Sequence, residues 1–123
     1  MLRIALCDDQ DVELQILKLH LERYQQTRNC GALSIDCFTS SAELVGTLRN
    51  DGRYDLFILD MVMPDYNGVE VGRAIRAGGL ESAIIYITAS PDFALSAISV
   101  HPEQYLLKPL DASALYEALD AVI

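Results

Sequence analysis

Carboxylate side chains directly follow two apolar segments of this 123-residue chain, and such side chains can bind metal ions or react. Leu56–Leu59 is a continuous apolar run that ends at Asp60, and such runs are typical of strands buried on both faces in a parallel sheet. The apolar segment at the start of the chain ends in the same way, at Asp8 and Asp9. Ligands bind at the carboxyl ends of strands in open α/β sheets, so these three carboxylates are candidates for one site.

Two further apolar segments end on groups of a different kind. The segment 83–87 is followed by Thr88, and the segment 104–107 is followed by Lys108. If all four segments are parallel strands, their carboxyl ends share one edge of the sheet. Three carboxylates, a hydroxyl and an ammonium group would then converge there, with an excess of negative charge.

This set of groups suits a divalent cation and a phosphoryl group. Mg²⁺ takes oxygen ligands and binds through one or two carboxylates plus a phosphate, so we expect Asp8 and Asp9 to hold it. Asp60 would be both a metal ligand and the attacking oxygen, because carboxylates form aspartyl-phosphate intermediates. Lys108 and Thr88 would contact the phosphoryl oxygens, where charge develops in the transition state.

Each group also has an ordinary structural interpretation. Asp60 and the pair Asp8 and Asp9 could cap the helices that follow them, since Asp is a favoured N-cap residue. Thr88 could be a turn hydroxyl and Lys108 a surface lysine. Their joint placement at four strand ends favours a site. A dinucleotide fold and a P-loop are disfavoured, because neither Gly-x-Gly-x-x-Gly nor Gly-Lys-Ser/Thr is present.

The segments between the apolar runs carry the helical spacing that would place these strand ends. Strands are predicted over 2–7, 33–38, 56–59, 83–87 and 104–107. Helices are predicted from 11 to about 27, from the Ser40 cap to about 49, from Gly68 to Gly78, from about 92 to 99, and from the Asp111 cap onwards. This alternation predicts an α/β fold, a doubly wound parallel sheet with helices on both faces. We expect one domain over 1–123, with any second domain absent from this sequence.

Composition narrows the class of protein. The chain has 18 acidic and 9 basic side chains and a net charge of −9, which opposes nonspecific binding to nucleic acid. No apolar run reaches the roughly 18 residues of a membrane span, so no membrane partner is expected. Cys7, Cys30 and Cys37 lack the spacing of a zinc site and suggest reduced thiols in a cytoplasm.

In their order and spacing, these residues resemble the receiver domain of two-component response regulators. The resemblance covers essentially the whole chain and rests on Asp8-Asp9, Asp60 with Pro64 and Gly68, Thr88 with Ala89, Tyr105, and Lys108-Pro109. The stretches 87–90 and 105–109 look most like the LytTR class, whose full-length members resemble transcription factors with a separate DNA-binding domain. The resemblance implies a flavodoxin-like fold of five strands and five helices, strand order 2-1-3-4-5, and a cis bond between Lys108 and Pro109.

The resemblance also implies a function, that of a phosphorelay signalling switch and not of an enzyme with turnover. A sensor histidine kinase would phosphorylate Asp60, with Mg²⁺ held by Asp8, Asp9, Asp60 and the backbone carbonyl of Val62. The output would be transcription, with DNA bound only through a C-terminal domain outside this sequence. The alternative from another class is a metal-dependent phosphohydrolase that uses the same acidic edge.

A candidate interface lies away from the acidic edge, on the predicted helix 92–99, the strand 104–107 and the last helix. Its apolar side chains exceed a single helical stripe, and exposed apolar surface often marks an interface. The candidate interface residues are Phe93, Leu95, Ile98 and Tyr116. We expect a homodimer through this face, and by the resemblance Thr88 and Tyr105 would be the switch residues that control it.

Overall fold

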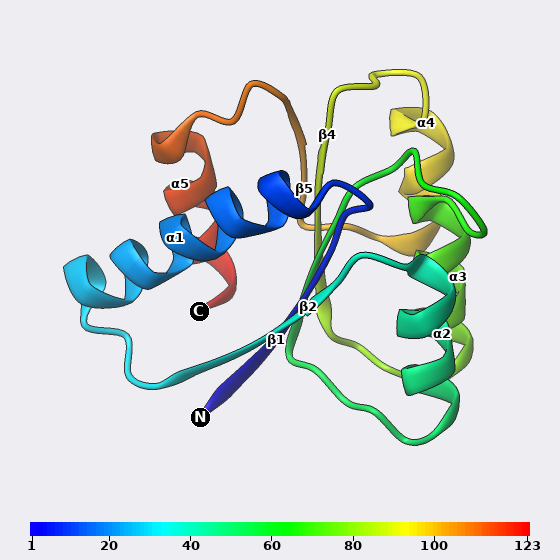
Figure 1. The fold of residues 1–123 in the computed structure, drawn as a ribbon, viewed down its shortest axis with the longest axis horizontal. Helices are drawn as coiled ribbons and strands as arrows, with labels where there is room; N and C mark the ends of the chain where they lie inside the picture. Colours follow the sequence, from blue (N-terminus) through cyan, green and yellow to red (C-terminus); the bar gives the residue numbers. More distant parts are fainter.

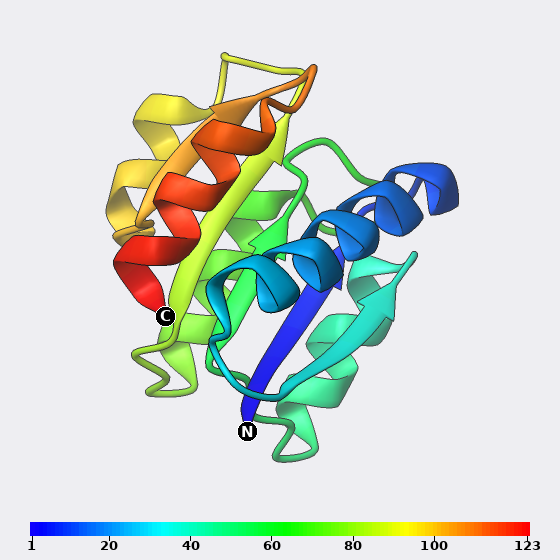
Figure 2. The ribbon, with the colours of Figure 1, turned by 90° about the vertical axis from the view of Figure 1, so that its left-hand side faces the viewer.

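The computed structural model describes all 123 residues, and its strands alternate with helices along the chain. The strands are β1 (Leu2–Cys7), β2 (Leu33–Phe38), β3 (Leu56–Leu59), β4 (Ala83–Thr88) and β5 (Gln104–Leu107). The helices are α1 (Asp11–Arg28), α2 (Ser41–Arg49), α3 (Gly68–Ala77), α4 (Ala94–Ala97), the 3-10 turn η1 (Ile98–Val100) and α5 (Ala112–Val122). All strands are parallel, in the order β2-β1-β3-β4-β5 (Figure 2), which confirms the predicted doubly wound α/β fold.

Helices cover both faces of the sheet, α1 and α5 on one and α2, α3 and α4 on the other (Figures 1 and 2). β3 is buried on both faces, because its side chains alternate between the two resulting cores. Leu56 and Ile58 pack in the core beneath α1 and α5, while Phe57 and Leu59 pack in the core beneath α2 and α3. This two-sided burial explains why the strand is a continuous apolar run.

The helices begin at polar caps. Ser40 accepts a hydrogen bond from the Glu43 backbone at the start of α2, and Asp111 accepts one from Ser113 at the start of α5. Both predicted caps are therefore confirmed. Asn67 and Glu70 form a reciprocal capping box at the start of α3, which fixes where the loop after β3 ends.

The predicted helix over 92–99 is wrong in its extent. Only Ala94–Ala97 is α-helical, no side chain caps its start, and the chain then tightens into the 3-10 turn. Ala97 and Val100 are buried against α3, where a side chain at Gly72 would collide with Val100 and the Tyr86 hydroxyl. Close packing on one glycine, together with weak capping, therefore decides the shape of this segment. None of the helices is both long enough and apolar enough to cross a membrane.

Candidate functional site

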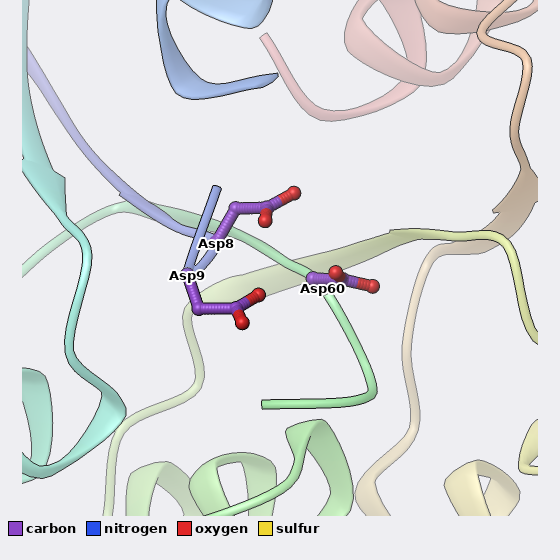
Figure 3. A group of neighbouring side chains, drawn as sticks. All are labelled: Asp8, Asp9 and Asp60. Carbon is purple, nitrogen blue, oxygen red and sulfur yellow. The ribbon is translucent and has the colours of Figure 1, made fainter. Parts of the chain in front are cut away.

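The three predicted carboxylates meet at the carboxyl edge of the sheet. β1 and β3 are neighbours, and the Asp60 backbone extends their pairing by donating to the Cys7 carbonyl at 2.9 Å. Asp8 and Asp9 follow β1, and Asp60 follows β3. In Figure 3 all three carboxylates point to the same side, and each offers an oxygen within 4.8 Å of the others. The strand pairing thus brings together residues that are about fifty positions apart in the sequence.

Asp8 is the most buried of the three carboxylates. Its Oδ1 accepts a hydrogen bond from the Gln10 backbone at 2.9 Å, and its Oδ2 accepts one from Lys108 Nζ at 2.9 Å. Burial raises the pKa of Asp8, the Lys108 and Gln10 hydrogen bonds oppose that rise, and the charge of Asp60 adds to it. The pKa of Asp8 therefore lies above its ordinary value, so this carboxyl binds a proton more readily than a free one does.

Lys108 brings the one ammonium group of the site. It follows β5, its Nζ lies 3.6 Å from Asp60 Oδ2 as well as 2.9 Å from Asp8 Oδ2, and the predicted cis peptide to Pro109 is confirmed. Glu13, in the first turn of α1, lies 3.9 Å from the same nitrogen. Burial lowers the pKa of Lys108, but the hydrogen bond to Asp8 and the charges of Asp60, Asp8 and Glu13 outweigh it and raise the net value.

The two raised pKa values share one contribution, the negative charge of Asp60, although burial is the largest cause for Asp8. Three carboxylates and Glu13 face a single ammonium group, so negative charge is in excess at this site. The same imbalance favours a cation. Hard oxygen donors on two adjacent strand ends fit a divalent ion such as Mg²⁺, and we conclude that Asp8, Asp9 and Asp60 could hold a metal.

Thr88 and Val62 complete the predicted set. Thr88 is the last residue of β4, it is buried, and its Oγ1 accepts from the Ser90 backbone at 3.2 Å. The Lys108 backbone donates to the Thr88 carbonyl at 2.9 Å, so the ends of β4 and β5 are joined beside the acidic group. Val62 lies on the exposed loop after Asp60. Its carbonyl as a metal ligand stays a prediction.

Comparison with known proteins gives this arrangement a family. The sequence profile of the response regulator receiver domain matches residues 4–120. This chain belongs to the receiver domain family of response regulators. The transcriptional regulatory protein NatR of Bacillus subtilis is 28% identical over 120 residues, which are 98% of this chain and 49% of NatR. The sensory transduction protein LytT of Bacillus cereus is 29% identical over 119 residues, 97% of this chain and 46% of LytT.

These relatives fit the predicted LytTR-class resemblance, and the receiver domain spans about half of their length. Solved structures agree with the fold. A response regulator receiver domain protein from Clostridium thermocellum superposes with a TM-score of 0.82 at 28% identity, covering 100% of this chain and 94% of that one. TrrA of Thermotoga maritima, solved in complex with Mg²⁺ and BeF, gives 0.83 at 28% identity with both chains fully covered.

The two predicted switch residues of the receiver domain lie on neighbouring strands. The Tyr105 hydroxyl donates to the Ser90 carbonyl at 2.6 Å, and its ring centre lies 5.8 Å from that of Tyr86. Ser90 also donates its backbone N–H to Thr88. Both switch residues therefore contact one residue of the loop between β4 and α4, which links the acidic edge to the start of α4.

The predicted interface residues do not all lie on one face. Leu95 and Ile98 are 81% and 61% exposed, and Leu107 at the end of β5 is 50% exposed. Phe93 is half-buried and packs against the core beneath α2 and α3. The placement of Tyr116 on this face is corrected by its contacts with α1, which are described next.

Tyr116 packs against α1. Its ring meets that of Tyr24 edge-on at 5.1 Å between centres, and the Arg28 guanidinium lies over it at 5.3 Å. The hydroxyl of Tyr24 donates to Asp120 at 2.7 Å, which also pairs with Arg28. The side of α5 that faces α1 is thus occupied within the domain, and Tyr116 is removed from the candidate interface.

Sequence reasoning missed Glu13 and Ser41. Glu13 is a polar residue within the predicted helix from 11 to about 27, and its approach to Lys108 depends on how α1 crosses the sheet. Ser41 is buried and bonds to the loop after Asp60. A polar residue directly beside the cap residue Ser40 was the available indication, because only one of two adjacent hydroxyls is needed as an N-cap.

Proposed function

We propose that this receiver domain accepts a phosphoryl group on Asp60 from a sensor histidine kinase. The observation that carries the proposal is the position of Asp60, which lies beside both Asp8 and Asp9 and 3.6 Å from the Lys108 ammonium. A carboxylate oxygen of Asp60 attacks phosphorus, the bond from phosphorus to the kinase histidine nitrogen breaks, and an acyl phosphate forms. The family match favours this switch over a phosphohydrolase with turnover.

Lys108 and Thr88 have separate roles in this transfer. Lys108 Nζ donates to phosphoryl oxygens, and its contact with Asp8 holds it at the edge. The Thr88 hydroxyl donates to another phosphoryl oxygen after leaving the Ser90 backbone. Asp8, Asp9 and Asp60, with the Val62 carbonyl, would bind Mg²⁺. When bound, Mg²⁺ neutralises charge on the transferring group.

Intact mass spectrometry tests the acceptor directly. The chain is incubated with acetyl phosphate and Mg²⁺, and we expect one phosphoryl group to be added to the wild type and none to Asp60→Asn. The amide is nearly isosteric but is not a nucleophile. Asp65→Asn, an exposed residue of the same loop, is the matched control and should be phosphorylated as the wild type is. A phosphorylated Asp60→Asn variant would place the acceptor elsewhere.

For the output, we infer control of transcription in the cytoplasm. NatR is named a transcriptional regulatory protein, and this chain covers less than half of its length. DNA would therefore be bound by a separate C-terminal domain of the full-length protein. The three cysteines are free thiols, which suits a reducing compartment.

We further infer that the surface formed by Leu95, Ile98 and Leu107 mediates a homodimer of the phosphorylated form. The three side chains are apolar and at least half exposed, and exposed apolar surface favours self-association. Sedimentation with and without beryllofluoride, a phosphoryl mimic, in Mg²⁺ measures it: the mimic should raise the molar mass, and Leu95→Glu should abolish the increase. Leu19→Glu, at an exposed apolar residue of α1, should leave it intact. A monomer at high concentration with the mimic bound would disprove this dimer.

A further inference from the structure

Ser41 is the first residue of α2, but its hydroxyl serves the loop after Asp60. Ser41 is 1% exposed. Its Oγ donates to the Pro64 carbonyl at 2.7 Å and accepts from the Tyr66 backbone N–H at 3.0 Å. One buried hydroxyl therefore holds both a carbonyl and an N–H group of a loop more than twenty residues away in the sequence.

The two loop groups that Ser41 holds are the two ends of a tight turn. The Tyr66 N–H also donates to the Pro64 carbonyl at 2.9 Å, across Asp65 alone, and Asp65 has a φ of 70°. A three-residue turn with this positive φ is the rare and strained form of the γ-turn. The Ser41 hydroxyl bridges the donor and the acceptor that close it, so it stabilises the turn in a conformation that a non-glycine residue disfavours.

The neighbouring serine separates this contact from ordinary helix capping. Ser40 is the N-cap of α2 and accepts from the Glu43 backbone at 3.2 Å. The Ser41 hydroxyl is consequently not needed to cap the helix. Two adjacent serines thus have two tasks, of which one is local to α2 and the other reaches the loop between β3 and α3.

We propose that Ser41 is a positioning residue for the metal and phosphoryl chemistry of Asp60. The proposal rests on the proposed function. The loop from Met61 to Asn67 leaves Asp60 and carries the Val62 carbonyl, the expected fourth metal ligand. Capping at Asn67 fixes its far end, and the Ser41 hydroxyl fixes its middle. Without that hydroxyl the turn relaxes, and the loop no longer holds the Val62 carbonyl in one position for the metal.

The test uses Ser41→Ala in the whole chain, with two readouts that do not depend on phosphorylation. The first is amide hydrogen exchange at Tyr66 without metal, which should be about tenfold faster in the variant. The second is the Mg²⁺ dissociation constant, obtained from the rise in melting temperature with Mg²⁺. It should weaken about tenfold, the usual effect of removing a group that orients a metal ligand. Ser41→Thr retains the hydroxyl and should restore both values.

Ser40→Ala is the matched control, because it removes the cap of α2 and leaves the turn contacts intact. It should lower the melting temperature without changing Tyr66 exchange or Mg²⁺ affinity. Should Ser41→Ala fail to fold, Ser41→Cys keeps the volume with weaker hydrogen bonds and should give intermediate values. Wild-type Mg²⁺ affinity in a folded Ser41 variant with faster exchange, or equal effects from Ser40→Ala, would overturn the proposal. Failure of the proposed function would give different results. The wild-type protein would not bind Mg²⁺, and the Asp60→Asn variant would still be phosphorylated.

Discussion

Replacing Lys108 by Met removes the only positive charge from the acidic edge and should destabilise the metal-free domain. Lys108 Nζ lies 2.9 Å from Asp8 Oδ2 and 3.6 Å from Asp60 Oδ2, and the three side chains are 18%, 8% and 11% exposed. A hydrogen bond to a charged group contributes about 1.5–3 kcal/mol. Loss of one partner from a fully buried pair costs about 3–5 kcal/mol. Because Met keeps the packing and a proton can replace the lost charge, we expect a loss of about 2 kcal/mol in the free energy of unfolding.

Mg²⁺ should reverse most of this loss, because a cation supplies the opposite charge that Lys108 supplied. Thermal unfolding followed by circular dichroism measures both effects. A loss of about 2 kcal/mol corresponds to roughly 8 °C in melting temperature for a domain of this size. At saturating Mg²⁺ the difference from wild type should fall below about 1 kcal/mol. By linkage, a coupling of about 1–2 kcal/mol means that the variant should bind Mg²⁺ about 5- to 30-fold more tightly than the wild type, although it loses the phosphoryl contact of Lys108.

Two results would refute this reasoning about charge. One is a Lys108→Met variant that is as stable as wild type without metal, which would mean that the ammonium group does not stabilise the carboxylates. The other is a loss of stability that Mg²⁺ leaves unchanged, which would point to packing and not to charge. Lys18→Met is the control, since Lys18 is exposed, forms no ion pair, and should change neither stability nor Mg²⁺ affinity.

Two further predictions concern regions outside the site. Burial, together with the hydrogen bond to Asp120, raises the pKa of Tyr24 from 10 to about 12. A raised folded-state pKa gives stability that is complete below pH 10 and is lost as the pH rises through 12. The free energy of unfolding measured in urea should therefore fall between pH 10 and pH 12. It should fall less steeply in Tyr24→Phe. Arg76 donates to four backbone carbonyls, among them those of Val100 and Ser82. Arg76→Met should therefore speed hydrogen exchange in the η1–β5 segment and lower stability by about 1–3 kcal/mol; unchanged exchange there would contradict the anchoring role.

The positions of Asp8, Asp60, Thr88 and Lys108 could be predicted because each follows the end of an apolar run. In a parallel sheet the carboxyl ends of all strands lie at one edge. The pattern of apolar runs in the sequence was therefore enough to place these four side chains together. Glu13 could not be placed in this way. Its approach to Lys108 depends on the angle at which α1 crosses the sheet, and helical periodicity reports only which side of the helix is apolar.

The candidate interface on α4, β5 and α5 was predicted less well, for a related reason. Tyr116 lies off the main apolar stripe of α5, and this position predicts an exposed side chain. Two helices on one face of a sheet also meet each other, however, so a second stripe finds a partner within the domain, here Tyr24 and Arg28. In the segment from 92 to 99, tertiary packing of Ala97 on α3 replaced regular helix by a 3-10 turn. Local propensity is a weak guide where capping is absent.

The distribution of hydrogen bonds in the segment formed by α4 and η1 indicates which end of it responds to a charge change at Asp60. The η1 end is held by Arg76, whose guanidinium donates to carbonyls at the end of η1 and in the loop between α3 and β4. The opposite end has no side-chain cap, and the turn that leads into it is closed by a 3.4 Å contact from the Ala94 N–H to the Pro91 carbonyl. That weakly held end is joined through Ser90 to both Thr88 and Tyr105. If phosphorylation draws the Thr88 hydroxyl away from Ser90, the rearrangement therefore falls on the start of α4, beside the exposed Leu95, while Arg76 keeps the end of the segment in place.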